Sequence, residues 1–183
     1  MAEHADRTLR PVNTRQVGEY SMPQRLSVLT VGTAVTLTML ASSPPATADN
    51  KRLNDSVVTN VYTLQHQAGC TNDVKKNPRL QLAAEWHARD VLANRGLHGD
   101  LGSDGSTAQD RASAAGYPGV VAQTVAVNPA LAINGLEILR QWYFDPVSYA
   151  VMADCAHTEI GVWSENSLDR SVVVAVYGRP TPD

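Results

Sequence analysis

Apolar residues recur every three or four positions between Leu53 and Ala68, and Gly69 follows them. This spacing predicts an amphipathic helix that stops just before Cys70. The polar stretch TNDVKK comes next and is expected to be a loop.

A second helix is predicted over residues 78–94, with proline in its first position and Asn77 as its N-cap. Glu85 and Arg89 are spaced to pair on its outer face. His87 falls on the apolar face, where a hydrogen-bonded core histidine is a better interpretation than a ligand.

The stretch from Gly96 to Tyr117 is dense in Gly, Ser and Asp and contains His98. Ser106 is expected to cap a short helix over residues 107–115, which Gly116 would end in a left-handed conformation. Such loops between capped helices often carry functional residues, but they are also ordinary connections.

A Val-rich strand is predicted over 120–127. The third helix, which follows it, is less clearly marked. Asn128-Pro129 repeats the capping pattern, so a helix is expected from there to Trp142. Gly135 weakens that prediction. The expected core positions are Leu131, Leu136, Leu139 and Trp142.

Asp145-Pro146 should break this helix, and a short helical turn is predicted for 147–152. Two strands follow, at 157–163 and 171–177, and the polar stretch SENSLDR between them predicts an antiparallel hairpin. Because helices come first and strands late, the order predicts an α+β layered domain.

Residues 1–48 are interpreted as an N-terminal extension with a secretory signal peptide. A basic start at Met22, an apolar run over 26–41 and the small-x-small pattern of residues 46–48 support this interpretation. The run is too short, and its exit too rich in proline, for a membrane span. We expect translation from Met22, cleavage after Ala48, and a protein that is secreted or held in the cell envelope.

The mature part is expected to be a single domain, residues 49–183, with its core over 53–178. It contains 11 Lys and Arg against 15 Asp and Glu. The basic residues are scattered, so nucleic acid is not an expected partner. No basic amphipathic helix or lipidation motif is present either. We expect a monomer.

Both cysteines, Cys70 and Cys155, lie in this mature part. In an exported protein an even pair predicts a disulfide. Closing a loop of about 85 residues would add roughly 4 kcal/mol on an entropic model. Two buried thiols are the alternative, and a metal site is less expected because no Cys-x-x-Cys pair is present.

Several dispersed motifs, in order, are similar to those of bacterial CAP (SCP) domains, the group of cysteine-rich secretory, antigen 5 and pathogenesis-related group-one proteins. They lie in the segment 77–118, which includes HA, GSDGS and AGY, in Trp142 with Asp145-Pro146, and in HTEIGVW and VVVAVYG. The resemblance implies a three-layer α-β-α sandwich with a central antiparallel sheet.

CAP domains typically gather two His and two acidic residues in a groove, sometimes around a divalent metal. Here His98 matches the first histidine and Asp145 one of the acids. The other acid would fall near Ala122, and the second histidine on Ala156 or, in the bacterial pattern, on Ser148. The candidate cavity residues are therefore His98 and Asp145, with His157 and Glu159 as further candidates nearby.

A divalent metal ion needs three or four convergent ligands, and only His98 and Asp145 match the family's set. No metal or cofactor is therefore expected. His98 could serve as a general acid–base, but no serine nearby has an evident catalytic partner. We expect a non-catalytic binding protein for a lipid, a cell-envelope component or a host molecule. The alternatives are a secreted protease-like hydrolase with a His98-centred cleft, and a purely structural envelope module. A polar cluster around His98 would favour catalysis, and an apolar cleft ligand binding.

Overall fold

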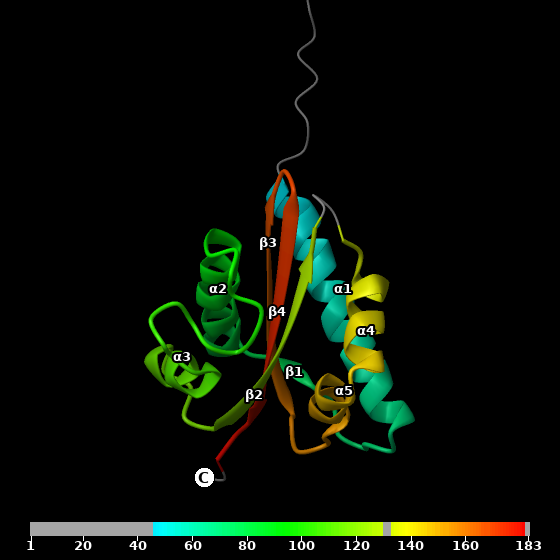
Figure 1. Ribbon diagram of the computed structural model, residues 1–183. Helices are drawn as coiled ribbons and strands as arrows, with labels where there is room; N and C mark the ends of the chain where they lie inside the picture. The colour runs from blue at the N-terminus through cyan, green and yellow to red at the C-terminus, as the bar shows by residue number, and fades with distance from the viewer. Residues whose placement is uncertain (1–45, 130–132, 182–183) are drawn as a thin grey trace, which may run out of the picture. The chain divides into compact units, whose positions relative to one another are not determined.

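The computed structural model describes residues 46–129 and 133–181. These residues form helices on both faces of a four-stranded sheet, in three layers (Figure 1). The predicted α+β class and layered α-β-α architecture are confirmed. The apolar run of the predicted signal peptide lies outside the described residues.

The sheet has the strand order β1-β3-β4-β2. The predicted hairpin is confirmed, and β2 pairs with β4 antiparallel on the far side. β1 is a two-residue strand parallel to β3 that forms where a loop was expected, so the sheet is mixed at this edge. The strands are β1 (Lys75–Lys76), β2 (Val120–Asn128), β3 (Glu159–Ser167) and β4 (Arg170–Arg179).

One face of the sheet is covered by α1, α4 and α5, and the other by α2 and α3 (Figure 1). β4 is buried from Arg170 to Gly178 because helices lie on both of its faces. Its alternate side chains enter two separate cores, which is the period-two pattern of a central strand. The helices are α1 (Ala46–Gln67), α2 (Pro78–Ala93), α3 (Ala108–Ala114), α4 (Gly135–Phe144) and α5 (Pro146–Ala153).

Local capping determines where the second and third of these helices begin. The Asn77 side chain accepts a 2.9 Å hydrogen bond from the Arg79 amide, as predicted. The α3 cap is Thr107 rather than Ser106, because Thr107 and Asp110 form a reciprocal capping box. Gly116 has the expected left-handed conformation, with φ of 83°.

The start of the next helix was predicted wrongly. Asn128 is the last residue of β2, and α4 begins at Gly135, where the Asn134 side chain caps the Glu137 amide at 2.9 Å. Its first residue is glycine because a Cβ there would overlap the Ser56 side chain of α1.

The residues of this helix that enter the core also differ from the prediction. Leu136, expected in the core, is 72% exposed, and Ile138 is buried instead. Trp142 is buried as predicted, and Leu139 is half-buried. Leu131 lies outside the described residues.

Cys70 and Cys155 form a disulfide with their Cα atoms 5.2 Å apart, as predicted. The bond joins the turn after α1 to the segment after α5. The side-chain amide of Asn72 also donates a 3.0 Å hydrogen bond to the Cys155 carbonyl. The two segments are therefore joined by a hydrogen bond as well as by the disulfide. Within the described ranges no helix is long and apolar enough to cross a membrane.

Candidate functional site

His98 lies on the loop between α2 and α3, where its side chain is exposed. It makes no hydrogen bond to any described residue. The histidine that organises this loop is His87, whose Nε2 lies 2.8 Å from the Gly99 carbonyl oxygen. His87 is fully buried, so the prediction of a hydrogen-bonded core histidine is confirmed.

A buried arginine holds the rest of the loop. Arg111 of α3 donates hydrogen bonds to the Asp100 carbonyl at 2.8 Å and to the Ser106 carbonyl at 2.7 Å. It also donates to the Gln123 side chain, which in turn donates to Asp100 Oδ1. Gln123 thus stands beside the position where the CAP resemblance expects an acid, and its amide serves loop structure.

Asp145 acts as a helix cap. Its Oδ2 accepts hydrogen bonds from the Ser148 amide at 2.9 Å and from the Ser148 hydroxyl at 2.6 Å. These bonds lower the pKa of the exposed Asp145 carboxyl. Both hydrogen bonds to the Asp145 carboxylate stabilise the first turn of α5.

His157 and Glu159 face opposite layers. His157 is buried, donates from Nδ1 to the Val151 carbonyl at 2.9 Å, and packs with its ring centre 5.9 Å from that of Tyr177 in the α1 layer. Glu159 faces the α2 layer, where burial and the Glu159 carboxylate together raise the pKa of Tyr117.

The structure therefore does not bring the four candidate residues into one cluster. Across residues 46–129 and 133–181, no group of three or more His, Cys, Asp or Glu side chains is placed to hold a metal ion. In the same ranges His98 has no carboxylate within hydrogen-bonding distance to orient it as a base. Among the described residues, His98 is therefore not part of a group of metal-ligating side chains.

A sizeable cleft lies instead along the outer edge of β3. Since β1 pairs only with Glu159 and Ile160, the rest of this edge has no neighbouring strand among residues 46–129 and 133–181. α1 and α2, on opposite faces of the sheet, overhang it and enclose about 520 Å³. We call this the edge cleft; its lining includes Asn50, Asn54, Gln81, Arg89, Trp163 and Glu165.

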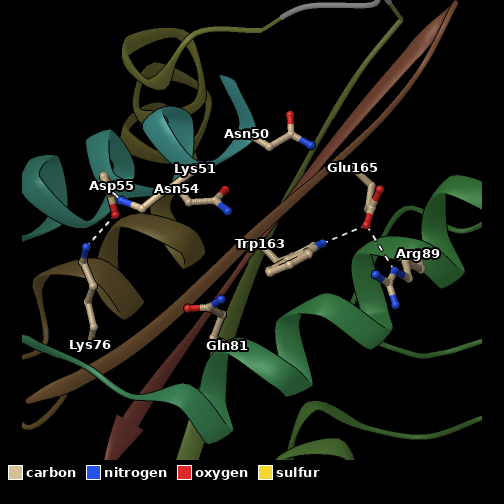
Figure 2. A pocket seen from close by; sticks show the side chains of 9 residues that line it. All are labelled: Asn50, Lys51, Asn54, Asp55, Lys76, Gln81, Arg89, Trp163 and Glu165. Atoms are coloured by element: carbon tan, nitrogen blue, oxygen red, sulfur yellow. Dashed lines mark hydrogen bonds and ion pairs between the residues drawn. The ribbon is translucent and has the colours of Figure 1, made fainter. Parts of the chain in front are cut away.

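An ordered chain of contacts fixes the indole of Trp163 in this cleft (Figure 2). The indole Nε1 donates a 2.8 Å hydrogen bond to Glu165, two residues along the same strand face. Arg89 of α2 contacts Glu165 at 3.1 Å and Glu85 at 2.6 Å, which confirms the predicted Glu85–Arg89 pair. The guanidinium carbon of Arg89 lies 5.9 Å from the indole centre.

The opposite wall of the cleft comes from α1 and β1 (Figure 2). Asp55 pairs with Lys51 at 2.8 Å and with Lys76 at 2.5 Å. Hydrogen bonds from Lys51 and then Lys76 lower the pKa of the Asp55 carboxyl. Beside them, Asn54 has a buried Oδ1 without a hydrogen-bond partner in the described part of the chain.

Sequence reasoning missed the edge cleft. Its residues come from α1, β1, α2 and β3, so no local motif contains them. The available indications were indirect: Trp163 and Glu165 share one strand face, and residues 81, 85 and 89 share one helix face. Predicting the cleft also requires knowing that β1 ends after two residues.

No protein-family model and no curated protein matches the sequence. Several solved structures match the fold. An outer surface protein from Borrelia burgdorferi matches with a TM-score of 0.62 at 15% identity, over 72% of this chain and 95% of that one. An extracellular protein containing an SCP domain, from Bacillus anthracis, gives 0.58 at 12% identity over 75% of this chain. The chain has the CAP (SCP) fold.

A cysteine-rich secretory protein from Staphylococcus aureus also matches, with a TM-score of 0.56 at 12% identity over 74% of this chain. The CAP-fold chain spans 45% of the Bacillus protein and 40% of the Staphylococcus protein. Identities this low show the fold alone. The function must therefore be argued from this chain's own residues.

Proposed function

We propose that the chain is an exported, non-catalytic CAP-fold protein that binds a lipid, a cell-envelope component or a host molecule. The observation that carries the proposal is the edge cleft, whose volume lies within the range typical of small-ligand sites. The candidate catalytic residues, in contrast, are dispersed over both faces of the sheet. A binding protein needs a cleft of this kind, but it does not need the candidate catalytic residues to converge.

The predicted cleavage would place the new N-terminus beside the edge cleft. Cleavage after Ala48 falls within the first turn of α1, and the new N-terminus at Asp49 would adjoin Asn50 of the cleft wall. N-terminal sequencing of protein from the culture medium should begin at Asp49. A cell-bound product that retains residues 26–41 would contradict export.

The binding function is tested by identifying what the protein carries. The protein is purified from the medium of its native host without denaturation, and bound molecules are extracted and identified by mass spectrometry. We expect a stoichiometric small molecule that is absent from a Trp163→Ala variant purified in parallel. Hydrolysis of peptide or ester substrates that His98→Ala abolishes would instead establish the alternative, a His98-dependent hydrolase.

An exposed aromatic surface, separate from the edge cleft, favours the lipid among these ligands. Tyr143, Phe144 and Tyr149 form edge-to-face ring contacts at the α4–α5 junction, with centres 5.3–5.4 Å apart. Phe144 and the nearby Val147 are 75% and 73% exposed. Contiguous exposed apolar groups of this kind mark interaction sites for proteins or membranes.

Vesicle co-sedimentation tests this surface. Binding to phosphatidylcholine–phosphatidylglycerol vesicles should fall when Phe144 and Val147 are both changed to Ser. Leu168→Ser is the matched control, because Leu168 is 89% exposed at the β3–β4 turn. Equal sedimentation of wild type, the double variant and Leu168→Ser would contradict lipid binding at this surface.

A further inference from the structure

The indole of Trp163 lines the edge cleft, and its N–H group is not available to a ligand. The N–H is already committed to Glu165 at 2.8 Å, and Arg89 holds Glu165 from α2. A side chain fixed in this way loses little entropy when a flat apolar surface stacks on it. The edge cleft is thus pre-organised around an aromatic platform.

Around the platform stand carboxamide groups with unused hydrogen-bonding capacity. Within the described residues the exposed Gln81 side chain makes no hydrogen bond, and neither does the Asn54 amide, whose Oδ1 is buried and reaches a ligand only if the amide turns. An amide both donates and accepts, so it suits hydroxyl groups, which also do both. Filling the cleft with a purely apolar chain would leave these groups buried and unpaired, which is costly.

The charges in the cleft are largely paired among themselves. Lys51 and Lys76 share Asp55, and Arg89 lies between Glu85 and Glu165. A strongly anionic ligand would have to displace these carboxylates. The cleft therefore matches a ligand that carries hydroxyls and no net charge.

The free edge of β3 is also a place where an extended peptide could add as a strand. Here that edge is obstructed: the Asn50 amide donates to the Ser164 carbonyl at 3.2 Å, and Asn166 donates to Asn50 at 2.6 Å. Side chains that cover an edge in this way prevent further pairing. The observations favour a small polyhydroxylated ligand over a peptide.

From these contacts we infer that the edge cleft binds a neutral oligosaccharide, with the apolar face of one sugar ring stacked on Trp163 and its hydroxyls bonded to Asn54 and Gln81. A pyranose ring presents axial C–H groups on its faces and hydroxyls around its rim, which is the complement of this lining. The inference rests on the proposed binding function and specifies its ligand class.

The test uses protein produced from the complete coding sequence and a panel of neutral trisaccharides: cellotriose, maltotriose and tri-N-acetylchitotriose. Saturation-transfer NMR detects the bound ring protons, and tryptophan fluorescence gives the affinity. We expect at least one trisaccharide to bind with a Kd of about 1 mM or tighter. Trp163→Ala should weaken that binding at least about tenfold, as loss of a stacking contact requires.

Three further variants keep the test decisive if Trp163→Ala does not fold. Trp163→Phe retains a ring and should bind more tightly than the alanine variant, and Asn54→Leu should bind more weakly than wild type. Trp86→Ala is the matched control: Trp86 is 39% exposed on α2 but lies outside the edge cleft, so its loss should leave the affinity unchanged.

Absence of binding by all three sugars, or unchanged affinity in Trp163→Ala and Asn54→Leu, would overturn the oligosaccharide assignment. If the protein from its native host then carries a lipid or peptide that Trp163→Ala loses, the binding function stands with a different ligand. If it carries nothing and shows His98-dependent hydrolysis, both proposals fail.

Discussion

His87 Nε2 lies 2.8 Å from the Gly99 carbonyl oxygen, and this bond ties the middle of α2 to the loop that contains His98. A carbonyl accepts only, so Nε2 carries the proton. Nδ1 is buried and has no partner in the described residues, which suits its unprotonated form. Burial, reinforced by the nearby charge of Arg111, lowers the pKa of His87 below its ordinary value of 6.5, so the ring is neutral in the folded protein.

This burial predicts a pH-dependent stability. The unfolded chain binds a proton at His87 at a higher pH than the folded chain does, so stability rises with pH across that interval. The contribution is complete above about pH 6.5 and is lost as the pH falls from there towards the lowered folded pKa. Urea unfolding at about pH 7.5 and about pH 5 should show a lower midpoint at the acidic value.

His87→Gln isolates this effect. A glutamine amide can still donate to the Gly99 carbonyl but does not titrate, so the variant should lose less stability than wild type between the two pH values. His98→Gln is the control, because His98 is exposed, and it should behave as wild type. Identical pH dependence in His87→Gln and wild type would contradict the assignment to His87.

The disulfide between Cys70 and Cys155 is expected to be a major source of stability. It closes a loop with a sequence separation of 85. Replacing both cysteines by alanine should lower the free energy of unfolding by about 2–5 kcal/mol. Urea denaturation of the double variant and of oxidised wild type measures the difference. Two alkylatable thiols in the native protein would show that the bond does not form in the cell.

Gly161 of β3 is predicted to tolerate no side chain. A Cβ there would overlap the backbone of Leu80 and Gln81, at the point where α2 crosses the strand. Gly161→Ala should therefore destabilise the protein by about 1–3 kcal/mol or more, as overpacking does. Gly96→Ala provides the control, because a Cβ at Gly96 meets nothing within 4 Å. Equal unfolding midpoints would mean that α2 can move away from the sheet without loss.

What the sequence predicted correctly was encoded locally. Asn77 and the proline after it mark the start of α2 within two residues, and Gly69 and Gly116 mark the ends of α1 and α3. The same local pattern at Asn128 failed because a distant pairing decided its conformation. Asn128 pairs with Ser171 in the β2–β4 ladder, and no feature near Asn128 in the sequence contains that partner.

The candidate site shows the same division. The resemblance named His98 and Asp145 by their motifs, but whether they converge depends on the layers in which their loops lie. His157 and Glu159 are two residues apart, yet His157 packs against Tyr177 and Glu159 lies beside Tyr117, on the other face. The edge cleft depends on where β1 ends, which only the folded sheet determines.

The last prediction concerns metal ions at His98. Asp145 is occupied in capping α5, and the His157 Nδ1 is bonded to the Val151 carbonyl. These contacts occupy only Asp145 Oδ2 and His157 Nδ1, but within residues 46–129 and 133–181 neither side chain lies in a group of three His, Cys, Asp or Glu that could hold a metal ion. We therefore expect no zinc or calcium binding tighter than micromolar, and an unfolding curve that chelators do not change.

Titration calorimetry of the exported protein with zinc and with calcium checks this expectation, with His98→Ala as the paired variant. Because the exposed His98 side chain makes no hydrogen bond to the described residues, His98→Ala should change the free energy of unfolding by no more than about 0.5 kcal/mol. A micromolar zinc isotherm that His98→Ala abolishes would contradict the prediction. Asp145, His157 or Glu159 would then have to rearrange to complete the site, and a metal-dependent activity would replace binding as the better proposal.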